Sequence, residues 1–182
     1  MAVNNIIKRI QNIMRQDAGI NGDAQRIEQM TWMFFLKVYD TQEETWEYKD
    51  ENYKSIIPED LRWRNWAIDE KDGEALTGEA LLSFVNERLF PTLKNLPIDA
   101  NTSRAKSIVQ ETFADLNQYM KNGTLLRQVV NIVNEIEFDD ADDRHTFGDI
   151  YEGILKDLQS AGNAGEFYTP RALTDFIVLM LD

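Results

Sequence analysis

A group of residues near the end of the chain has the chemistry to bind a small anionic molecule. The stretch from Gly165 to Arg171 combines a glycine, two aromatic residues and the start of a helix. Thr169 is a preferred type of helix-capping residue and Pro170 suits the first helical position, which predicts a helix over 170–181. The free amides at such an end attract anions. The candidate binding residues are Glu166, Phe167, Tyr168, Thr169, Pro170 and Arg171.

These residues allow two interpretations. In the first, Phe167 and Tyr168 form an apolar shelf beside the helix start, while Glu166 accepts from an ammonium or hydroxyl group. That arrangement describes a pocket for a zwitterionic or phosphorylated molecule. In the second, the helix is simply capped and both aromatic residues belong to the core. Spacing alone favours the second interpretation, because capped helices that start with proline are common in helical proteins.

The same residues resemble a motif of a known family. Gly165 to Arg171, followed by an apolar helix, is similar to the cofactor-side motif of the DNA-modification (M) subunits of type I restriction-modification systems. Three further stretches resemble that family's amino-terminal helical region in order and spacing: Thr31 to Asp40, Leu61 to Ala67 and Gly148 to Leu155. The resemblance therefore extends over nearly the whole chain.

The resemblance implies an adenine-specific DNA methyltransferase that uses S-adenosylmethionine. Glu166 to Arg171 would close over the methionine end of this cofactor, with the helix start at Thr169 and Pro170 facing its carboxylate. The family also implies three protein partners: a specificity subunit, a motor-endonuclease subunit and a second modification subunit. DNA would be bound through the assembled complex.

The catalytic motifs of that family are missing from this sequence. The family uses a glycine-rich turn between a strand and a helix, and an Asn-Pro-Pro-aromatic tetrapeptide. No two of the nine glycines are spaced as Gly-x-Gly, and no two of the four prolines are adjacent. We therefore expect an N-terminal piece of a longer protein, inactive by itself, whose catalytic residues follow Asp182. The alternative is a stand-alone helical module for protein–protein interaction.

Apolar periodicity predicts an all-α fold. A surface helix is expected over residues 3–14, and a second from about Asp23 to Lys49, whose apolar middle should be the buried centre of a bundle. Further helices are expected from Thr77 to near Pro91, from about Ile108 to Asn122-Gly123, and from Leu125 to Ile136. Short turns between them favour antiparallel packing in an orthogonal or bundle-like domain.

The aromatic-rich stretch from Trp46 to Trp66 has two interpretations. Its tryptophans and tyrosines are interleaved with lysines and arginines, a pattern that can stack on nucleic-acid bases. Carboxylates within and after the stretch make its neighbourhood acidic, which favours a long loop that aromatic side chains pin to the helices. We expect the structural role.

A domain boundary is expected near Gly162. Thr146 should cap a helix with an apolar face from Phe147 to Leu158, and the small residues that follow form a linker. This predicts a helical domain over residues 1–161. The segment 162–182 would then hold the cofactor-side loop and the first helix of a downstream α/β methyltransferase fold.

The composition restricts the function classes. A net charge of −13 and a pI near 4.5 argue against autonomous binding to nucleic acid, which normally needs a basic surface. With no cysteine and one histidine, His145, we expect neither a metal site nor a nucleophile paired with a base. The carboxylates between Glu135 and Asp143 lack EF-hand spacing and indicate a solvated turn. No apolar run reaches 18 residues, so we expect no membrane span and a cytoplasmic protein.

Overall fold

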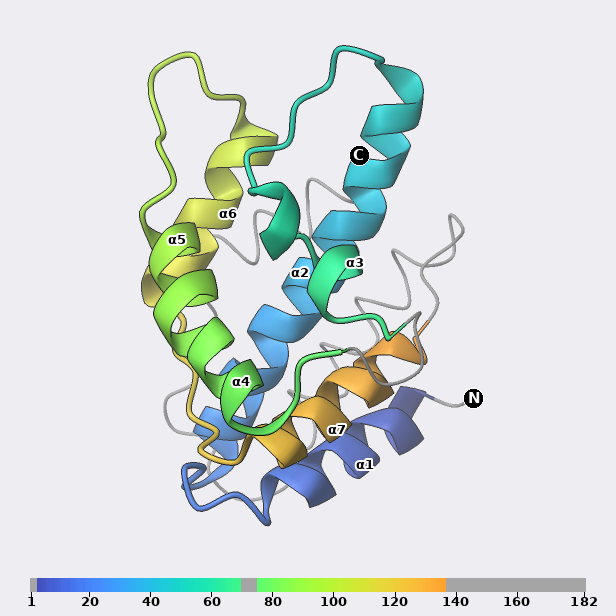
Figure 1. The fold of residues 1–182 in the computed structure, drawn as a ribbon, viewed down its shortest axis with the longest axis vertical. Helices are drawn as coiled ribbons and strands as arrows, with labels where there is room; N and C mark the ends of the chain where they lie inside the picture. The colour runs from blue at the N-terminus through green and yellow to red at the C-terminus, as the bar shows by residue number, and fades with distance from the viewer. Residues whose placement is uncertain (1–2, 70–74, 137–182) are drawn as a thin grey trace.

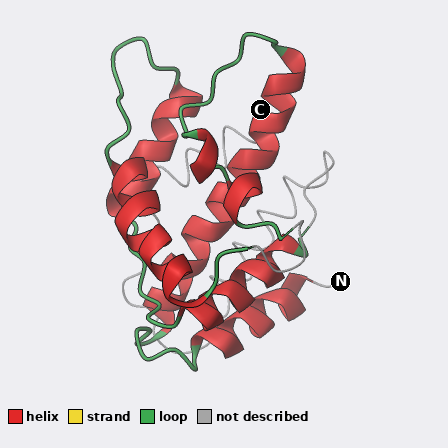
Figure 2. Ribbon diagram, in the orientation of Figure 1, coloured by secondary structure: helices red, strands yellow, loops and turns green. Residues whose placement is uncertain are grey.

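The computed structural model describes residues 3–69 and 75–136, and all regular elements in these two ranges are helical (Figure 2). The all-α prediction is therefore confirmed. The elements are α1 (Val3–Met14), α2 (Asp23–Lys49), a 3-10 helix η1 (Glu59–Leu61), α3 (Trp63–Trp66), α4 (Gly78–Ser83), a π-helix η2 (Phe84–Leu89), α5 (Phe90–Lys94), α6 (Arg104–Asp115) and α7 (Gly123–Asn134).

Helix α2 is the centre of the domain, as its all-round apolar middle predicts. It runs along the long axis of the molecule, with α5 and α6 on one side, while α1 and α7 lie side by side across its lower end (Figure 1). Trp32, Met33 and Phe35 are completely buried. The helix stays unbroken for 27 residues because it contains no glycine or proline. It begins after Gly22, whose φ of 98° suits glycine.

The helix expected to end near Pro91 instead continues to Lys94. Its register changes on the way, from α4 through the π-helix η2 to α5. The N–H of Phe90 donates to the carbonyl of Val85, five residues earlier, so Pro91 falls at the start of a new α-helical register. Proline has no N–H to donate and is tolerated at such a start, which explains why it does not end the helix.

The helix expected to run to Asn122-Gly123 ends at Asp115. The segment 116–122 is not helical, although Leu116 and Met120 are buried as the apolar spacing predicts. Side chains of α2 offer this backbone other partners: Gln29 accepts from the N–H of Tyr119, and Glu28 accepts from that of Asn117, at 2.8 Å each. Asn122 is therefore the N-cap of α7 rather than a helix end, because it accepts from the N–H groups of Thr124 and Leu125.

Several predictions from the sequence fall outside the described residues. They are the helix capped by Thr146, His145, the linker before Gly165, the carboxylates from residue 137 onward, and the candidate binding residues 166–171. The division into domains at residues 1–161 and 162–182 stays a prediction for the same reason.

Candidate functional site

The six candidate cofactor residues, Glu166 to Arg171, lie outside the described residues, so their roles stay predictions. Two other stretches that carry the family resemblance, Thr31 to Asp40 and Leu61 to Ala67, are described. The structure brings them together where α2, α3 and α7 meet. We call this region the α2–α3–α7 junction and build it from its side chains.

Arg64 and Asp40 form the centre of the junction. The Nε of Arg64 donates to Asp40 Oδ1 at 2.9 Å, and the Arg64 backbone N–H donates to Asp40 Oδ2 at 3.1 Å. The same guanidinium reaches Glu47 at 3.0 Å and the backbone carbonyl of Asp40 at 3.1 Å. Burial raises the pKa of Asp40, although the hydrogen bonds and charge of Arg64 act against this rise. A four-residue helix is too short to be stable in isolation, so these bonds fix α3 on α2.

A second buried carboxylate holds the loop that leads to α3. Glu43 is completely buried and accepts from the Tyr53 hydroxyl at 2.8 Å and the Ser55 hydroxyl at 2.6 Å, both through Oε1. Within the described residues its Oε2 is buried without a hydrogen-bond partner. Burial raises the pKa of Glu43, and the two hydroxyl donors only partly offset that effect.

The aromatic residues of this region pack as the structural interpretation expects. Trp46 lies between Tyr39 and Tyr53, with ring centroids 5.7 and 5.8 Å away. Trp63 and Trp66 are buried and meet edge to face at 5.0 Å. Tyr48 is the exception, since 91% of its surface is exposed.

Helix α7 joins the junction through its last turn. Lys37 of α2 donates to the carbonyls of Val133 and Asn134, at 3.0 Å each, and so caps the end of α7. The Asn134 side chain accepts from the indole N–H of Trp63 at 2.8 Å and donates to the Ala67 carbonyl at 2.9 Å. One asparagine therefore connects α7 with both ends of α3.

Arg127 of α7 ties down the backbone on both sides of residues 70–74. Its buried guanidinium donates to the carbonyls of Leu76 at 2.7 Å, Ala67 at 2.8 Å and Trp66 at 3.3 Å. Burial lowers the pKa of this guanidinium. Its three bonds therefore connect α7 with the backbone at Trp66, Ala67 and Leu76.

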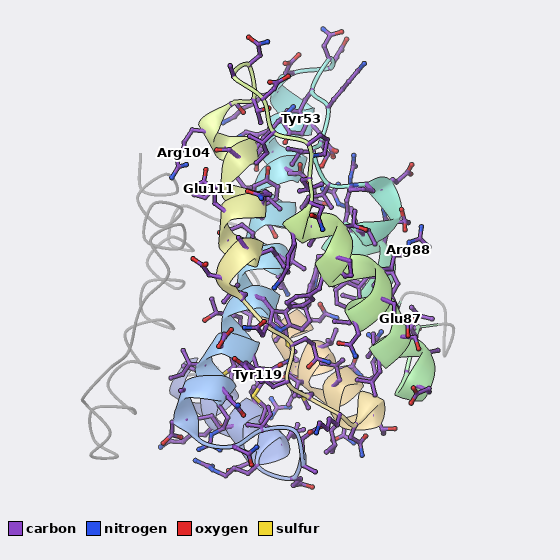
Figure 3. All side chains as sticks on the ribbon, turned by 90° about the vertical axis from the view of Figure 1, so that its left-hand side faces the viewer. Tyr53, Glu87, Arg88, Arg104, Glu111 and Tyr119 are labelled. Carbon is purple, nitrogen blue, oxygen red and sulfur yellow. The ribbon has the colours of Figure 1, made fainter. Side chains whose placement is uncertain are left out.

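A pocket of about 540 Å³ opens beside the junction, between α3 and η2. Trp66 and Phe84 form its apolar wall, with ring centroids 5.4 Å apart. Its arginines are already paired within the protein: Arg64 with Asp40 and Glu47, and Arg88 with Asp60. Figure 3 shows Arg88 and Glu87 on the outer side of η2. Both arginines that line the pocket therefore already have carboxylate partners.

The described residues offer little other chemistry. They contain no group of three His, Asp or Glu side chains placed to hold a metal ion. Within the same ranges, the helices are all too short or too polar to cross a membrane.

The sequence contains one indication of the junction that apolar periodicity does not explain, namely two carboxylates at buried positions of α2. Asp40 and Glu43 interrupt the buried stripe of α2, where burying a carboxylate is costly unless it has partners. Arg62 and Arg64 follow in a short aromatic stretch and lie on α2 in the structure. Carboxylates at buried helical positions indicate that polar partners must come from elsewhere in the chain, but they do not identify Arg64 for Asp40 or the hydroxyl groups of Tyr53 and Ser55 for Glu43.

Two protein families match the chain in succession. The HsdM N-terminal domain family matches residues 3–133, and the N-6 DNA Methylase family matches residues 142–182. The first match alone covers most of the chain and includes every described helix except the last residue of α7.

Curated relatives agree with these families. The methylase subunit of the type I restriction enzyme EcoEI from Escherichia coli is 56% identical over 184 residues, which cover 100% of this chain and 36% of that subunit. The methylase subunit of the type I restriction enzyme StySPI from Salmonella potsdam is 26% identical over 130 residues, or 69% of this chain and 22% of the relative. The chain thus spans about a third or less of these relatives.

Solved structures share the fold. A chain from Vibrio vulnificus YJ016, described as a modification subunit of a type I restriction enzyme, matches with a TM-score of 0.77 and 35% identity over 99% of this chain and 40% of its own. A second, from a study of complex assembly and conformational transition in the type I restriction-modification system, matches with a TM-score of 0.70 and 37% identity. That match covers 93% of this chain and 33% of its own.

Proposed function

Because this chain belongs to the family of type I restriction-modification methylase subunits, we propose that it serves as the N-terminal part of a subunit that methylates adenine in DNA. The observation that carries the proposal is the order of the two family matches, with the helical domain first and the start of the methylase domain directly after it. A stand-alone interaction module would not require the second match.

The helical part has a supporting rather than a catalytic role in this proposal. Its buried charges are used to fix helices at the α2–α3–α7 junction, and its pocket holds paired arginines. We propose that residues 1–161 form the helical domain and that residues 162–182 begin the methyltransferase domain. Methyl transfer would then depend on motifs beyond the 182 residues.

The cofactor of the whole subunit is S-adenosylmethionine in this proposal. The N-6 DNA Methylase match supports a methyl donor and includes all six candidate residues, Glu166 to Arg171. The helix start predicted at Thr169 and Pro170 would receive the cofactor carboxylate, because free amides and the helix dipole favour an anion there. This gives the stretch a binding role without proton transfer.

The partners proposed for the whole subunit are a specificity subunit, a motor-endonuclease subunit and a second modification subunit, with DNA bound through the assembly. Relatives named as subunits of type I restriction enzymes support membership of a complex. We propose that the complex acts in the cytoplasm, where its DNA substrate lies.

Methyl transfer tests the function directly. The full-length subunit with its specificity subunit is expected to transfer radiolabelled methyl from S-adenosylmethionine to adenine in duplex DNA. The 182-residue chain alone is expected to transfer none. If the complete complex methylates no adenine in any duplex sequence tested, the proposed methyltransferase function is refuted. A gene with a stop codon directly after Asp182 would favour the interaction module.

Thr169→Val in the full-length subunit tests the cofactor site. The change keeps the β-branched shape and removes the capping hydroxyl, so affinity for S-adenosylmethionine measured by calorimetry should fall. A lost cap costs roughly 0.5–2 kcal/mol, which equals a few-fold to about thirty-fold in affinity if the bound state bears the whole loss.

Thr174→Val is the matched control, since it makes the same chemical change five residues later in the predicted helix. It should leave the affinity unchanged. Phe167→Ala examines the apolar shelf independently of the cap. Unchanged affinity for both Thr169→Val and Phe167→Ala would show that the stretch has a structural role alone.

A further inference from the structure

The negative charge of the chain is unevenly distributed. Residues 3–69 and 75–136 contain fifteen lysines and arginines against eighteen aspartates and glutamates, whereas the remaining residues contain four against fourteen. The described helical part is therefore close to neutral, although the whole chain carries −13. The net charge of the whole chain therefore does not exclude contact between this part and a polyanion.

Two neighbouring helices of the described part contain no acidic residue. Helices α1 and α7 contain no aspartate or glutamate, and they lie side by side (Figure 1). Asn5, Lys8 and Asn12 follow one exposed stripe of α1, and Arg15 extends it one residue past the helix end. Thr124, Gln128 and Asn131 form the exposed stripe of α7. We call these two stripes, together with the exposed Lys121, the α1–α7 surface.

Two described carboxylates that adjoin this surface, Glu135 and Asp17, are paired or buried. Glu135 receives both terminal nitrogens of Arg9, at 2.5 and 2.8 Å, across the seam between the helices. Asp17 is 4% exposed and accepts from the backbone N–H groups of Lys121 and Asn122. Among the described residues, no carboxylate forms an ion pair with Lys8, Arg15 or Lys121.

The side chains of this surface suit a phosphate backbone better than a protein partner. Lysine, arginine, asparagine, glutamine and threonine are the residues that contact phosphates and sugars of DNA. Protein interfaces instead have an aromatic or aliphatic centre. The three large apolar side chains that are exposed in the described ranges, Tyr48, Ile68 and Ile98, all lie on other elements.

We propose that the α1–α7 surface contacts the sugar-phosphate backbone of duplex DNA without reading its sequence. The proposal rests on the proposed function, in which DNA is bound by the assembled complex. Lys8 and Arg15 are seven residues apart, about 10 Å along a helix. A duplex carries about six phosphate charges over that length. The surface neutralises a few phosphates within a larger interface, so the isolated chain is not expected to bind tightly.

The test uses the full-length subunit assembled with its specificity subunit, and a fluorescent duplex of random sequence. Lys8→Gln with Lys121→Gln removes two positive charges from the α1–α7 surface while keeping the side chains long and polar. The control is Lys49→Gln with Lys54→Gln, two exposed lysines at the opposite end of α2. Both double variants lower the total charge equally.

The Lys8/Lys121 variant should bind DNA more weakly at about 50 mM salt, by roughly tenfold for each phosphate that its lysines no longer neutralise. The slope of log affinity against log salt should become shallower by about 0.9 for each such phosphate. The control should retain the affinity and slope of the unmodified complex. Equal weakening in both variants, or none in either, would overturn the proposal.

Two further outcomes separate this proposal from competing explanations. If the Lys8/Lys121 variant fails to assemble with the specificity subunit in size-exclusion chromatography, the surface binds an acidic protein and the proposal is wrong. If the unmodified complex shows the predicted salt response but methylates no adenine, the DNA contact stands and the proposed function fails. If the complex methylates adenine normally and the Lys8/Lys121 variant keeps the DNA affinity and salt slope of the unmodified complex, the DNA contact is refuted and the proposed function stands.

Discussion

The α2–α3–α7 junction and the α1–α7 pair are held together by different means. At the junction, Asp40 and Glu43 are buried in the core helix and have their partners on the following loop and on α3. In the α1–α7 pair, buried apolar stripes such as Ile6, Ile7 and Ile10 face the core, and Arg127 of α7 is the one charged residue of the two helices that is buried among the described residues.

The difference follows from the length of the elements. Helices α1 and α7 each have 12 residues, long enough for an apolar stripe to decide how they pack. Helix α3 has four residues and cannot present such a stripe, so directional bonds from Arg64 and Asn134 fix its position together with its two buried tryptophans. The two regions should therefore respond to different mutations.

The largest expected effect comes from Gly123→Ala at the start of α7. A Cβ atom there would lie 1.8 Å from the carbonyl oxygen of Gly78, in the first turn of α4. Backbone cannot move aside as a flexible side chain would, so we expect a loss of about 3–4 kcal/mol, at or above the upper end for overpacking. Urea unfolding of the chain, followed by circular dichroism, measures this loss.

Gly22→Ala is the control for this prediction. Gly22 has φ of 98°, but nothing lies within 4 Å of the position of its added Cβ. Only backbone strain should be felt, roughly 1–3 kcal/mol. If Gly123→Ala lost no more stability than Gly22→Ala, the close backbone contact between Gly123 and Gly78 would not determine how the start of α7 packs on α4.

The next largest effect is expected at the junction, from Asp40→Ala. Arg64 would lose its buried carboxylate and keep a charge that is 22% exposed. Breaking a buried pair costs about 3–5 kcal/mol, and the partial exposure of Arg64 places this one near 3 kcal/mol. The free energy of unfolding of Asp40→Ala, Arg64→Ala and the double variant forms a mutant cycle.

The double variant should be less destabilised than the two single losses added together. An additive result would mean that Asp40 and Arg64 act independently, and the contrast between the two regions would then be wrong. Glu44→Ala is the control, because its carboxylate is 58% exposed and 3.6 Å from Arg64, where an exposed pair contributes less than about 1 kcal/mol.

The long helices could be predicted because periodicity determines them. The ranges expected for α1 and α2 agree with the structure, and the apolar middle of α2 is its buried core. Helix ends were harder to predict. Neither the π-helical register that accommodates Pro91 nor the side chains of Glu28 and Gln29 that hold residues 116–122 has a local sequence signal.

The junction shows why pairings are not visible in sequence. Its carboxylates come from α2, whereas Arg62 and Arg64 come from the start of α3, 15 to 24 residues later in the chain, and burial decides which of several candidates meet. Asn134 reaches Trp63 and Ala67 from 67 or more residues away. The candidate cofactor residues Glu166 to Arg171 lie outside the described residues, and their assignment depends on motif similarity.

The smallest expected effect concerns Glu43 and is seen in how the stability of the junction depends on pH. Burial raises the pKa of Glu43 in the folded protein, so the folded state holds this proton more tightly than the unfolded chain does. Glu43 then contributes most to stability below its ordinary pKa of 4.5, and this contribution is lost as pH rises through the raised value. Asp40 contributes with the same sign.

Glu43→Gln isolates the part due to Glu43. The amide oxygen can still accept from Tyr53 and Ser55, and no charge has to be buried at any pH. At acidic pH the variant should differ from the unmodified chain by less than about 1 kcal/mol, the scale of one hydrogen bond. As pH rises above the ordinary pKa of 4.5, the free energy of unfolding of the variant should increase relative to that of the unmodified chain.

Asp99→Asn is the control for Glu43→Gln, because Asp99 is exposed and hydrogen bonds from its neighbours lower its pKa. A lowered pKa stabilises the folded state at higher pH, so the relative stability of this variant should change with pH in the opposite direction. If the difference between Glu43→Gln and the unmodified chain stayed constant with pH, the carboxyl group of Glu43 would titrate alike in both states. The junction would then hold its charge without the cost inferred from its burial.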